Sequence, residues 1–142
     1  MNKLIAQKRK IALLLLMVIT LSFSACKVQL ISAYDDAIHT QITSAAKDID
    51  TFYTLMLATT TQGSTARQYT NYAANYANIE VELRQLYTIN STRAKNAQQD
   101  TICKLTLNQW LKYENMHKTN GTLRDFEITL NRDFMLAKMQ CN

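Results

Sequence analysis

The sequence predicts an all-α protein, an antiparallel bundle of three to four helices. The chain of 142 residues contains no proline, and its only glycines are Gly63 and Gly121. Helix-forming residues such as Ala, Leu, Gln, Lys and Arg are spread throughout, and long stretches repeat apolar residues at spacings of three and four. A chain with so few helix breakers has few places to turn, so the two glycines mark expected breaks between helices.

The first expected helix covers roughly residues 28–61. One face carries apolar side chains at helical spacing: Ile31, Tyr34, Ile38, Ile42, Ala45, Ile49, Phe52 and Met56. About 33 residues at 1.5 Å each give a helix on the order of 50 Å long. A polar break follows at residues 59–64, where Ser64 or Thr65 is available to cap the next helix.

A tyrosine-rich pattern predicts the second helix. Its stripe alternates spacings of four and three: Tyr69, Tyr72, Tyr76, Ile79, Leu83 and Leu86. An aromatic stripe at this spacing is more typical of a core, with hydroxyl groups at its rim, than of a ligand platform. Residues 88–100 lose the pattern and are either a loop or a polar continuation of the second helix. A continuation would leave three helices instead of four.

Two more helices are expected on either side of Gly121. The third has apolar residues near one face and ends in a basic turn and a glycine cap. Its stripe is Ile102, Cys103, Leu107, Trp110 and Leu111. Residues 122–125, Thr-Leu-Arg-Asp, form a predicted capping box for the last helix. The stripe predicted for that helix is Leu123, Phe126, Leu130, Phe134, Ala137 and Cys141.

The first 26 residues have the pattern of a signal peptide followed by a cysteine. Lys3, Lys8, Arg9 and Lys10 precede an uninterrupted apolar run at residues 11–21. The end of this segment resembles the lipobox of bacterial lipoprotein precursors: Phe23-Ser24-Ala25-Cys26 matches three of four places, with Phe23 where Leu is usual. The resemblance implies diacylglycerol transfer to Cys26, cleavage after Ala25 and acylation of the new amino terminus. It divides the chain into a signal peptide, 1–25, and a lipid-anchored helical domain, 26–142.

Two alternatives compete with this interpretation. An uncleaved, single-pass signal anchor would need roughly 20 apolar residues, and residues 11–21 fall short of that length. An ordinary secretory signal would make Cys26 incidental, although a cysteine directly after Ser-Ala at the end of an apolar run favours the lipoprotein.

The charge of the chain gives no indication of nucleic-acid binding. The sequence has 16 Lys+Arg and 11 Asp+Glu, and four of the basic residues lie in residues 1–25. The remaining chain is nearly balanced, with 12 basic and 11 acidic residues. The pI near 9.2 therefore reflects mainly a segment expected to be removed.

The other two cysteines are expected to form a disulfide. If the third and fourth helices form a hairpin that turns near Asn120, Cys103 and Cys141 lie near the same end of it. An exported domain is in an oxidising compartment, where such a pair forms a bond. Free thiols or a bond to another chain are the alternatives.

Candidates for catalytic or metal chemistry are few. Asp36 and His39, and Glu114 and His117, have the three-residue spacing of the Glu-x-x-His pairs in di-iron bundles. Glu80, Glu82 and Glu127 are possible further carboxylates. The predicted phases argue against such a metal site, because Asp36 and His39 fall beside the apolar stripe and the helix dipole explains a histidine near the end of the third helix. No cofactor is expected, and an enzyme is the minority interpretation.

The mature segment also resembles a group of small, uncharacterised helical lipoproteins of Gram-negative bacteria. The resemblance is carried by three short motifs: Tyr34-Asp35-Asp36, residues 48–52, and Arg132-Asp133-Phe134 with Lys138. It implies no activity. Lys27 after the acylated cysteine resembles the pattern that permits export to the outer membrane in enteric-type bacteria.

These observations favour a non-enzymatic protein of the bacterial envelope. Its lipid anchor would hold it on a membrane, at the periplasmic face of the outer membrane, where it would serve a protein partner as a binding or structural accessory. A small set of residues lies off or at the edge of the main stripes: Tyr53, Tyr87, Tyr113 and Val81. They form either a contact surface for such a partner or a broader core.

Overall fold

The computed structural model describes residues 35–140, so the predicted signal segment, Cys26 and Cys141 lie outside the described residues. The chain divides into two units, Met1–Leu30 and Ile31–Asn142, and all described helices belong to the second unit. Residues 35–140 contain four α-helices and no strand: α2 (Asp36–Thr59), α3 (Ala73–Ser91), α4 (Ala97–Asn120) and α5 (Asp125–Gln140). The predicted all-α bundle is confirmed, and its three-helix alternative is wrong.

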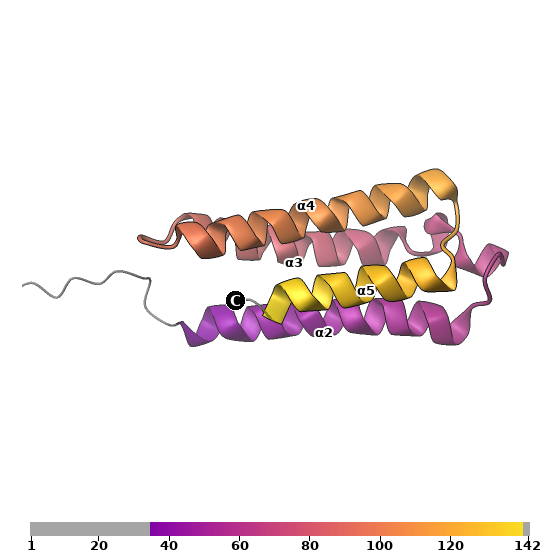
Figure 1. Ribbon diagram of the computed structural model, residues 1–142, viewed down its shortest axis with the longest axis horizontal. Helices are drawn as coiled ribbons and strands as arrows, with labels where there is room; N and C mark the ends of the chain where they lie inside the picture. The colour runs from indigo at the N-terminus through magenta and orange to yellow at the C-terminus, as the bar shows by residue number, and fades with distance from the viewer. Residues whose placement is uncertain (1–34, 141–142) are drawn as a thin grey trace, which may run out of the picture. The chain divides into compact units, whose positions relative to one another are not determined.

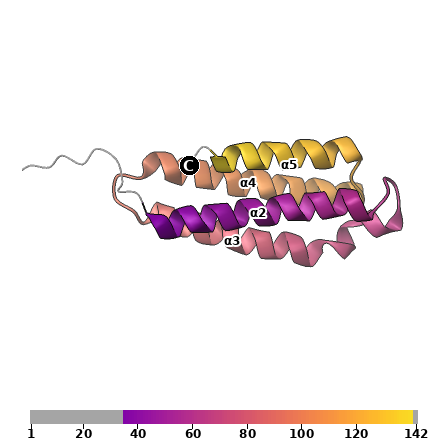
Figure 2. The ribbon, with the colours of Figure 1, turned by 90° about the horizontal axis from the view of Figure 1, so that it is seen from below.

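The four helices run antiparallel to one another in chain order (Figures 1 and 2). Helix α3 packs most extensively on α4, and α2 packs most extensively on α5. Helix α2 begins, and α5 ends, toward the end of the bundle where residues 92–96 connect α3 to α4 (Figure 1). We call this the α3–α4 end, and we call the opposite end, where residues 121–124 connect α4 to α5, the α4–α5 end. Short connections of this kind are typical of up-and-down bundles.

Asp35 determines where α2 begins in the described chain. Its carboxylate accepts hydrogen bonds from the backbone N–H groups of Ala37, at 3.0 Å, and Ile38, at 3.3 Å. These two groups have no partner within the helix, so an aspartate N-cap stabilises the first turn. The helix ends at Thr59, two residues before the predicted boundary. Residues 28–34 of the predicted helix lie outside the described residues.

The connection between α2 and α3 differs from the prediction. Ser64 and Thr65 do not cap an α-helix; two 3-10 turns, η1 (Thr65–Arg67) and η2 (Tyr69–Asn71), come first. Gln68 has an extended backbone between them, with φ −69° and ψ 143°, so the two turns cannot merge into one helix. The backbone N–H of Tyr69 instead donates to the carbonyl of Gly121, at 2.9 Å, which ties this connection to the turn after α4.

Residues 88–100, for which the sequence left two alternatives, contain a real interruption. Helix α3 ends at Ser91 and α4 begins at Ala97. The side-chain amide of Asn96 donates to both the carbonyl and the side-chain oxygen of Asn90, at 3.0 and 2.8 Å, and both residues are buried. Lys95 has a positive φ of 60°, which reverses the chain direction here. A pair of buried asparagines therefore closes the turn.

The turn into α5 confirms the glycine cap and corrects the capping box. Gly121 has φ 76° at the end of α4, a conformation that glycine adopts without steric cost. The predicted pair was Thr122 with Asp125. In the structure Glu127 accepts a hydrogen bond from the backbone N–H of Arg124, at 2.8 Å, so the acidic member of the box lies two residues later. The carboxylate of Asp125 instead forms an ion pair with Arg67.

Aromatic side chains from three helices fill the centre of the core. Ring centroids lie 4.8 Å apart for Phe52 and Tyr76 and 5.1 Å apart for Tyr76 and Trp110. The indole N–H of Trp110 donates to the carbonyl of Tyr76, at 3.2 Å, so its polar atom is satisfied inside the core. Of the four residues at the stripe edges, Tyr53 and Tyr113 are buried, Tyr87 is half-buried, and Val81 is exposed. The tyrosines therefore broaden the core.

The predicted core stripe of the last helix is wrong. Apart from Leu123, which precedes α5, its large members are exposed: Phe126 by 57%, Leu130 by 60% and Phe134 by 45%. The face packed in the bundle consists of Ile128, Asn131, Met135 and Met139. Both faces have helical spacing, but Asn131 interrupts the apolar pattern of the buried one, so the sequence favoured the outward face. No helix within residues 35–140 combines the length and apolarity needed to cross a membrane.

Candidate functional site

Within residues 35–140, a buried polar cluster lies at the α4–α5 end and is built around Arg67. This side chain is only 1% exposed although it comes from the short turn η1. Its guanidinium donates to the hydroxyl of Thr60, at 2.9 Å, to the carbonyl of Leu123, at 3.3 Å, and forms an ion pair with Asp125. Arg67 thus joins the end of α2, the turn η1 and the start of α5.

His117 continues this cluster into the core. Its Nε2 lies 2.9 Å from the backbone carbonyl of Arg67, and its Nδ1 lies 3.2 Å from the hydroxyl of Tyr76. A carbonyl can only accept, so Nε2 carries the proton and Nδ1 accepts from the tyrosine. We call these five residues the Arg67–His117 network: Thr60, Arg67, Tyr76, His117 and Asp125.

Within the network, His117 and Tyr76 are held in their neutral forms. Burial lowers the pKa of His117. The hydrogen bond to the Arg67 carbonyl raises it, and the nearby guanidinium of Arg67 lowers it further. Burial also raises the pKa of Tyr76 well above 10. A neutral imidazole that accepts from a phenol is a stable hydrogen bond and leaves no activated nucleophile. The geometry therefore fixes the packing of five segments: the end of α2, η1, α3, α4 and the start of α5.

The sequence predicts a core position for Tyr76, assigns no role to Arg67 and explains His117 by the helix dipole. In the structure His117 is fully buried. Its place seven residues after Trp110 on the core stripe is a signal that could have identified it. Arg67 lies in a short polar turn, where helical periodicity gives no information.

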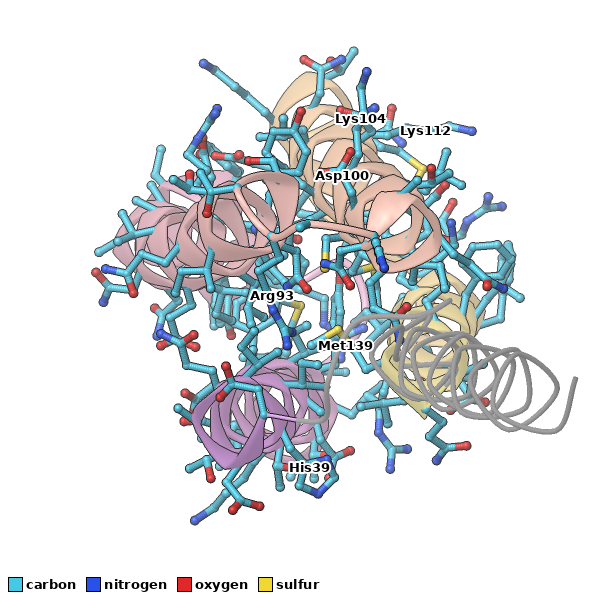
Figure 3. All side chains as sticks on the ribbon, turned by 90° about the vertical axis from the view of Figure 1, so that its left-hand side faces the viewer. His39, Arg93, Asp100, Lys104, Lys112 and Met139 are labelled. Atoms are coloured by element: carbon cyan, nitrogen blue, oxygen red, sulfur yellow. The ribbon has the colours of Figure 1, made fainter. Side chains whose placement is uncertain are left out.

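The residues considered for a di-iron site do not come together. Asp36 and His39 are exposed at the start of α2, and His39 points away from the bundle (Figure 3). Glu114 accepts a hydrogen bond from the hydroxyl of Tyr69, at 2.8 Å. In the described part of the chain, no three His, Cys, Asp or Glu side chains converge on a point where they could hold a metal ion.

The other carboxylates proposed for that site have separate environments. Glu80 forms an ion pair with Arg84, and Glu127 forms one with Arg124, whose hydrogen bond lowers the pKa of Glu127. Glu82 is half-buried beside Asp48, and burial followed by this neighbouring carboxylate raises its pKa.

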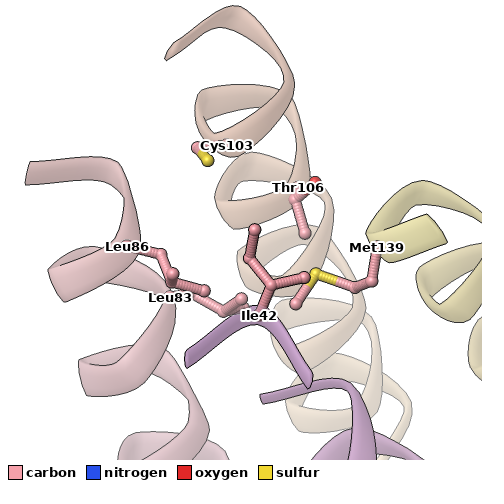
Figure 4. Close-up of a pocket in the computed structure, with 6 residues that line it drawn as sticks. All are labelled: Ile42, Leu83, Leu86, Cys103, Thr106 and Met139. Atoms are coloured by element: carbon pink, nitrogen blue, oxygen red, sulfur yellow. The ribbon is translucent and has the colours of Figure 1, made fainter. Parts of the chain in front are cut away.

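Cys103, which the sequence paired with Cys141, lies in the core near the α3–α4 end. Its sulfur lines a cavity of about 10 Å³ together with side chains from all four helices: Ile42, Leu83, Leu86, Thr106 and Met139 (Figure 4). Burial and the nearby Asp100 raise the pKa of the Cys103 thiol to about 11. Met139 is two residues before Cys141 in the chain. The disulfide stays a prediction because Cys141 lies outside the described residues.

A surface depression of about 310 Å³ lies at the α3–α4 end. It is lined by mostly polar residues of the last turn of α3, the connection and the first turn of α4: Asn90, Ser91, Arg93, Lys95, Asn96, Ala97 and Asp100. Oδ1 of Asp100 is buried there without a hydrogen-bond partner. Arg93 lies 3.9 Å from the carboxylate of Asp35, which links this connection to the start of α2 (Figure 3).

The exposed apolar side chains of α5 are a second candidate site, one that could bind another surface. Phe126, Leu130 and Phe134 follow one another at intervals of four residues along the outward face, and we call them the α5 ridge. The guanidinium of Arg124 lies 4.4 Å from the ring centroid of Phe126, and the ammonium of Lys138 lies 5.2 Å from that of Phe134. The ridge therefore has a cation on each of its two rings.

Comparison with known proteins finds no matching family model, no matching curated protein and no matching solved structure.

Proposed function

We propose that this chain is a lipoprotein of the bacterial envelope, held on a membrane by acyl chains on Cys26 and acting as a non-enzymatic binding or structural accessory protein. The observation that carries the proposal is the sequence pattern of residues 8–26, in which a basic cluster, an apolar run and small residues lead directly into a cysteine. Acyl chains on one residue supply a stable attachment without a membrane-spanning helix.

The bundle supports a binding role over a catalytic one. Its buried polar cluster at the α4–α5 end, the Arg67–His117 network, is committed to contacts that hold segments of the bundle together. The three apolar side chains of the α5 ridge are exposed and follow one another along the outward face of α5. We further propose that the partner is an envelope protein and that the domain sits at the periplasmic face of the outer membrane.

The test is the intact mass of the protein isolated from the membrane fraction of a bacterial host. We expect a mass equal to residues 26–142 plus acyl chains, and a gain of two hydrogens on reduction. The variant C26S should lose the acyl chains and remain unprocessed, whereas C103S, a matched change elsewhere in the chain, should keep them. An unmodified wild-type mass that begins at Met1 would refute the proposal and leave an uncleaved signal anchor.

A further inference from the structure

We propose that the α5 ridge is a membrane-contact surface that lies on the phospholipid bilayer holding Cys26. The inference rests on the proposed lipid anchor and adds to it an orientation of the bundle. It begins from the outward position of Phe126, Leu130 and Phe134, because three large apolar side chains exposed along one helix face are unfavourable in water.

The length of the chain before α2 allows this contact. Asp36 lies ten positions after Cys26, and a chain of that length reaches at most about 35 Å when fully extended. Helix α5 has 16 residues and is therefore about 24 Å long. Helix α2 begins toward the same end of the bundle where α5 ends (Figure 1). An anchor at Cys26 can therefore lie beneath any part of the ridge.

The charges around the ridge suit a bilayer with anionic lipids. Lys138 lies over the ring of Phe134, where its ammonium can meet phosphate while the ring enters the interface. Arg124 lies over the ring of Phe126 and is paired with Glu127 at 2.6 Å. Each acidic residue of α5 has an arginine within 4 Å: Asp125 with Arg67, Glu127 with Arg124, and Asp133 with Arg132. These pairs reduce the repulsion that three carboxylates would otherwise exert on lipid phosphates.

The exposed area favours a bilayer over a second copy of the chain. About half of each of three side chains amounts to on the order of 300 Å², whereas a stable interface buries about 800 Å² on each partner. An antiparallel pairing of two ridges centred on Leu130 would also place Glu127 opposite Asp133, which are like charges. A membrane contact needs less area, because the acyl chains already hold the domain at the surface.

The test uses the full-length protein in vesicles of phosphatidylethanolamine and phosphatidylglycerol that contain dibrominated lipid, which quenches tryptophan at the interface. L130W places the probe on the ridge. V81W is the matched control, because Val81 is similarly exposed, at 54%, and lies on α3, diagonally across the bundle from α5 (Figure 3). The native Trp110 is buried and gives both variants the same background.

We expect quenching of L130W at least about twofold stronger than that of V81W. Equal quenching would overturn the proposal. So would shielding of L130W from aqueous acrylamide without quenching by lipid, a result that would indicate a protein partner or a second copy. The mass of the same preparation is measured first. If the chain is acylated and L130W is not quenched, the membrane contact of the α5 ridge is refuted and the lipid anchor stands. If the chain is not acylated, both proposals fail, because the distance from the ridge to the bilayer is argued from an anchor at Cys26.

Discussion

The two ends of the bundle are held together by different kinds of contact. At the α4–α5 end, the buried guanidinium of Arg67, in η1, binds groups from the end of α2, the α4–α5 turn and the start of α5, and the Arg67 carbonyl accepts from His117. At the α3–α4 end, Asp35 caps its own helix, Asn96 bonds to Asn90 six residues away, and Arg93 pairs with Asp35 at 3.9 Å, with both side chains partly exposed. The first end is fixed by a buried charge with several partners from distant segments, the second by local hydrogen bonds and a partly exposed ion pair.

This difference indicates where the bundle opens most easily. A buried charge with several partners strongly disfavours any rearrangement that leaves it unpaired. Caps and loop contacts are each worth about 1 kcal/mol and break separately. We therefore infer that the α4–α5 end sets the register of the helices, and that local opening begins at the α3–α4 end, toward which the chain enters from the predicted anchor.

The largest expected effect comes from the predicted disulfide, which would add a long-range contact to the weaker end. A bond between Cys103 and Cys141 closes a loop of 38 residues and contributes roughly 4 kcal/mol in the chain-entropy model. We expect C141S to lower the free energy of unfolding by about that amount, measured by urea denaturation of the oxidised protein. Adding reductant should destabilise the wild type and leave C141S unchanged. Equal stability of the oxidised wild type and C141S would contradict the bond.

The second largest effect should come from Arg67, the centre of the stronger end. R67M keeps an unbranched side chain but removes every donor, so the Thr60 and Leu123 carbonyls lose a partner. We expect a loss of about 3 kcal/mol in urea denaturation. The matched control is R84M, since Arg84 is 57% exposed and pairs with Glu80 on its own helix; it should cost less than about 0.5 kcal/mol. Similar costs for the two variants would show that the ends do not differ as described.

Helical periodicity predicted the fold and most of the core because burial follows spacing in α2, α3 and α4. Ile38, Leu83 and Trp110 all lie where the three-and-four pattern places them. Helix α5 is the exception, since it carries two stripes of the same period. The stripe with Leu130 is more apolar, but the bundle packs the one with Asn131. Periodicity identifies a face and cannot by itself decide whether that face meets the core.

The polar network could not be predicted from the sequence. It depends on a turn residue, Arg67, meeting a residue 58 positions later, Asp125, and no local pattern encodes that separation. His117 was within reach of the same spacing argument that identified Trp110. A histidine near a helix end is explained equally well by the helix dipole, which does not require burial, so the sequence does not decide between the two explanations.

His117 makes the stronger end sensitive to pH, with a smaller effect than Arg67. Its pKa is lowered from 6.5 in the folded protein, so below pH 6.5 the unfolded chain binds a proton that the folded one excludes. Stability is therefore complete above pH 6.5 and falls as the pH drops toward the lowered pKa, by at most about 1.4 kcal/mol per pH unit. The groups that face His117 are Arg67, Tyr69, Tyr72 and Tyr76.

The comparison that isolates this effect is between H117Q and H39Q. Glutamine keeps hydrogen-bonding atoms but has no charge to gain, so H117Q should show a flatter dependence of unfolding free energy on pH between 7 and 5. H39Q removes an exposed histidine from the other end of the bundle and should keep the wild-type dependence. A wild-type slope in H117Q would mean that another group controls acid sensitivity.

The smallest effect tests the weaker end through the N-cap of α2. D35A removes the carboxylate that accepts from the backbone N–H groups of Ala37 and Ile38, and it also removes the partner of Arg93 at 3.9 Å. We expect a loss of about 1 kcal/mol. The control is D36A, because Asp36 lies in the first turn of α2, where its charge interacts with the helix dipole, and its loss should cost about 0.3 kcal/mol. Hydrogen exchange gives the sharper measurement. In D35A the first turns of α2 should exchange faster while amides near Arg67 keep their protection, whereas uniformly faster exchange would show that the two ends open together.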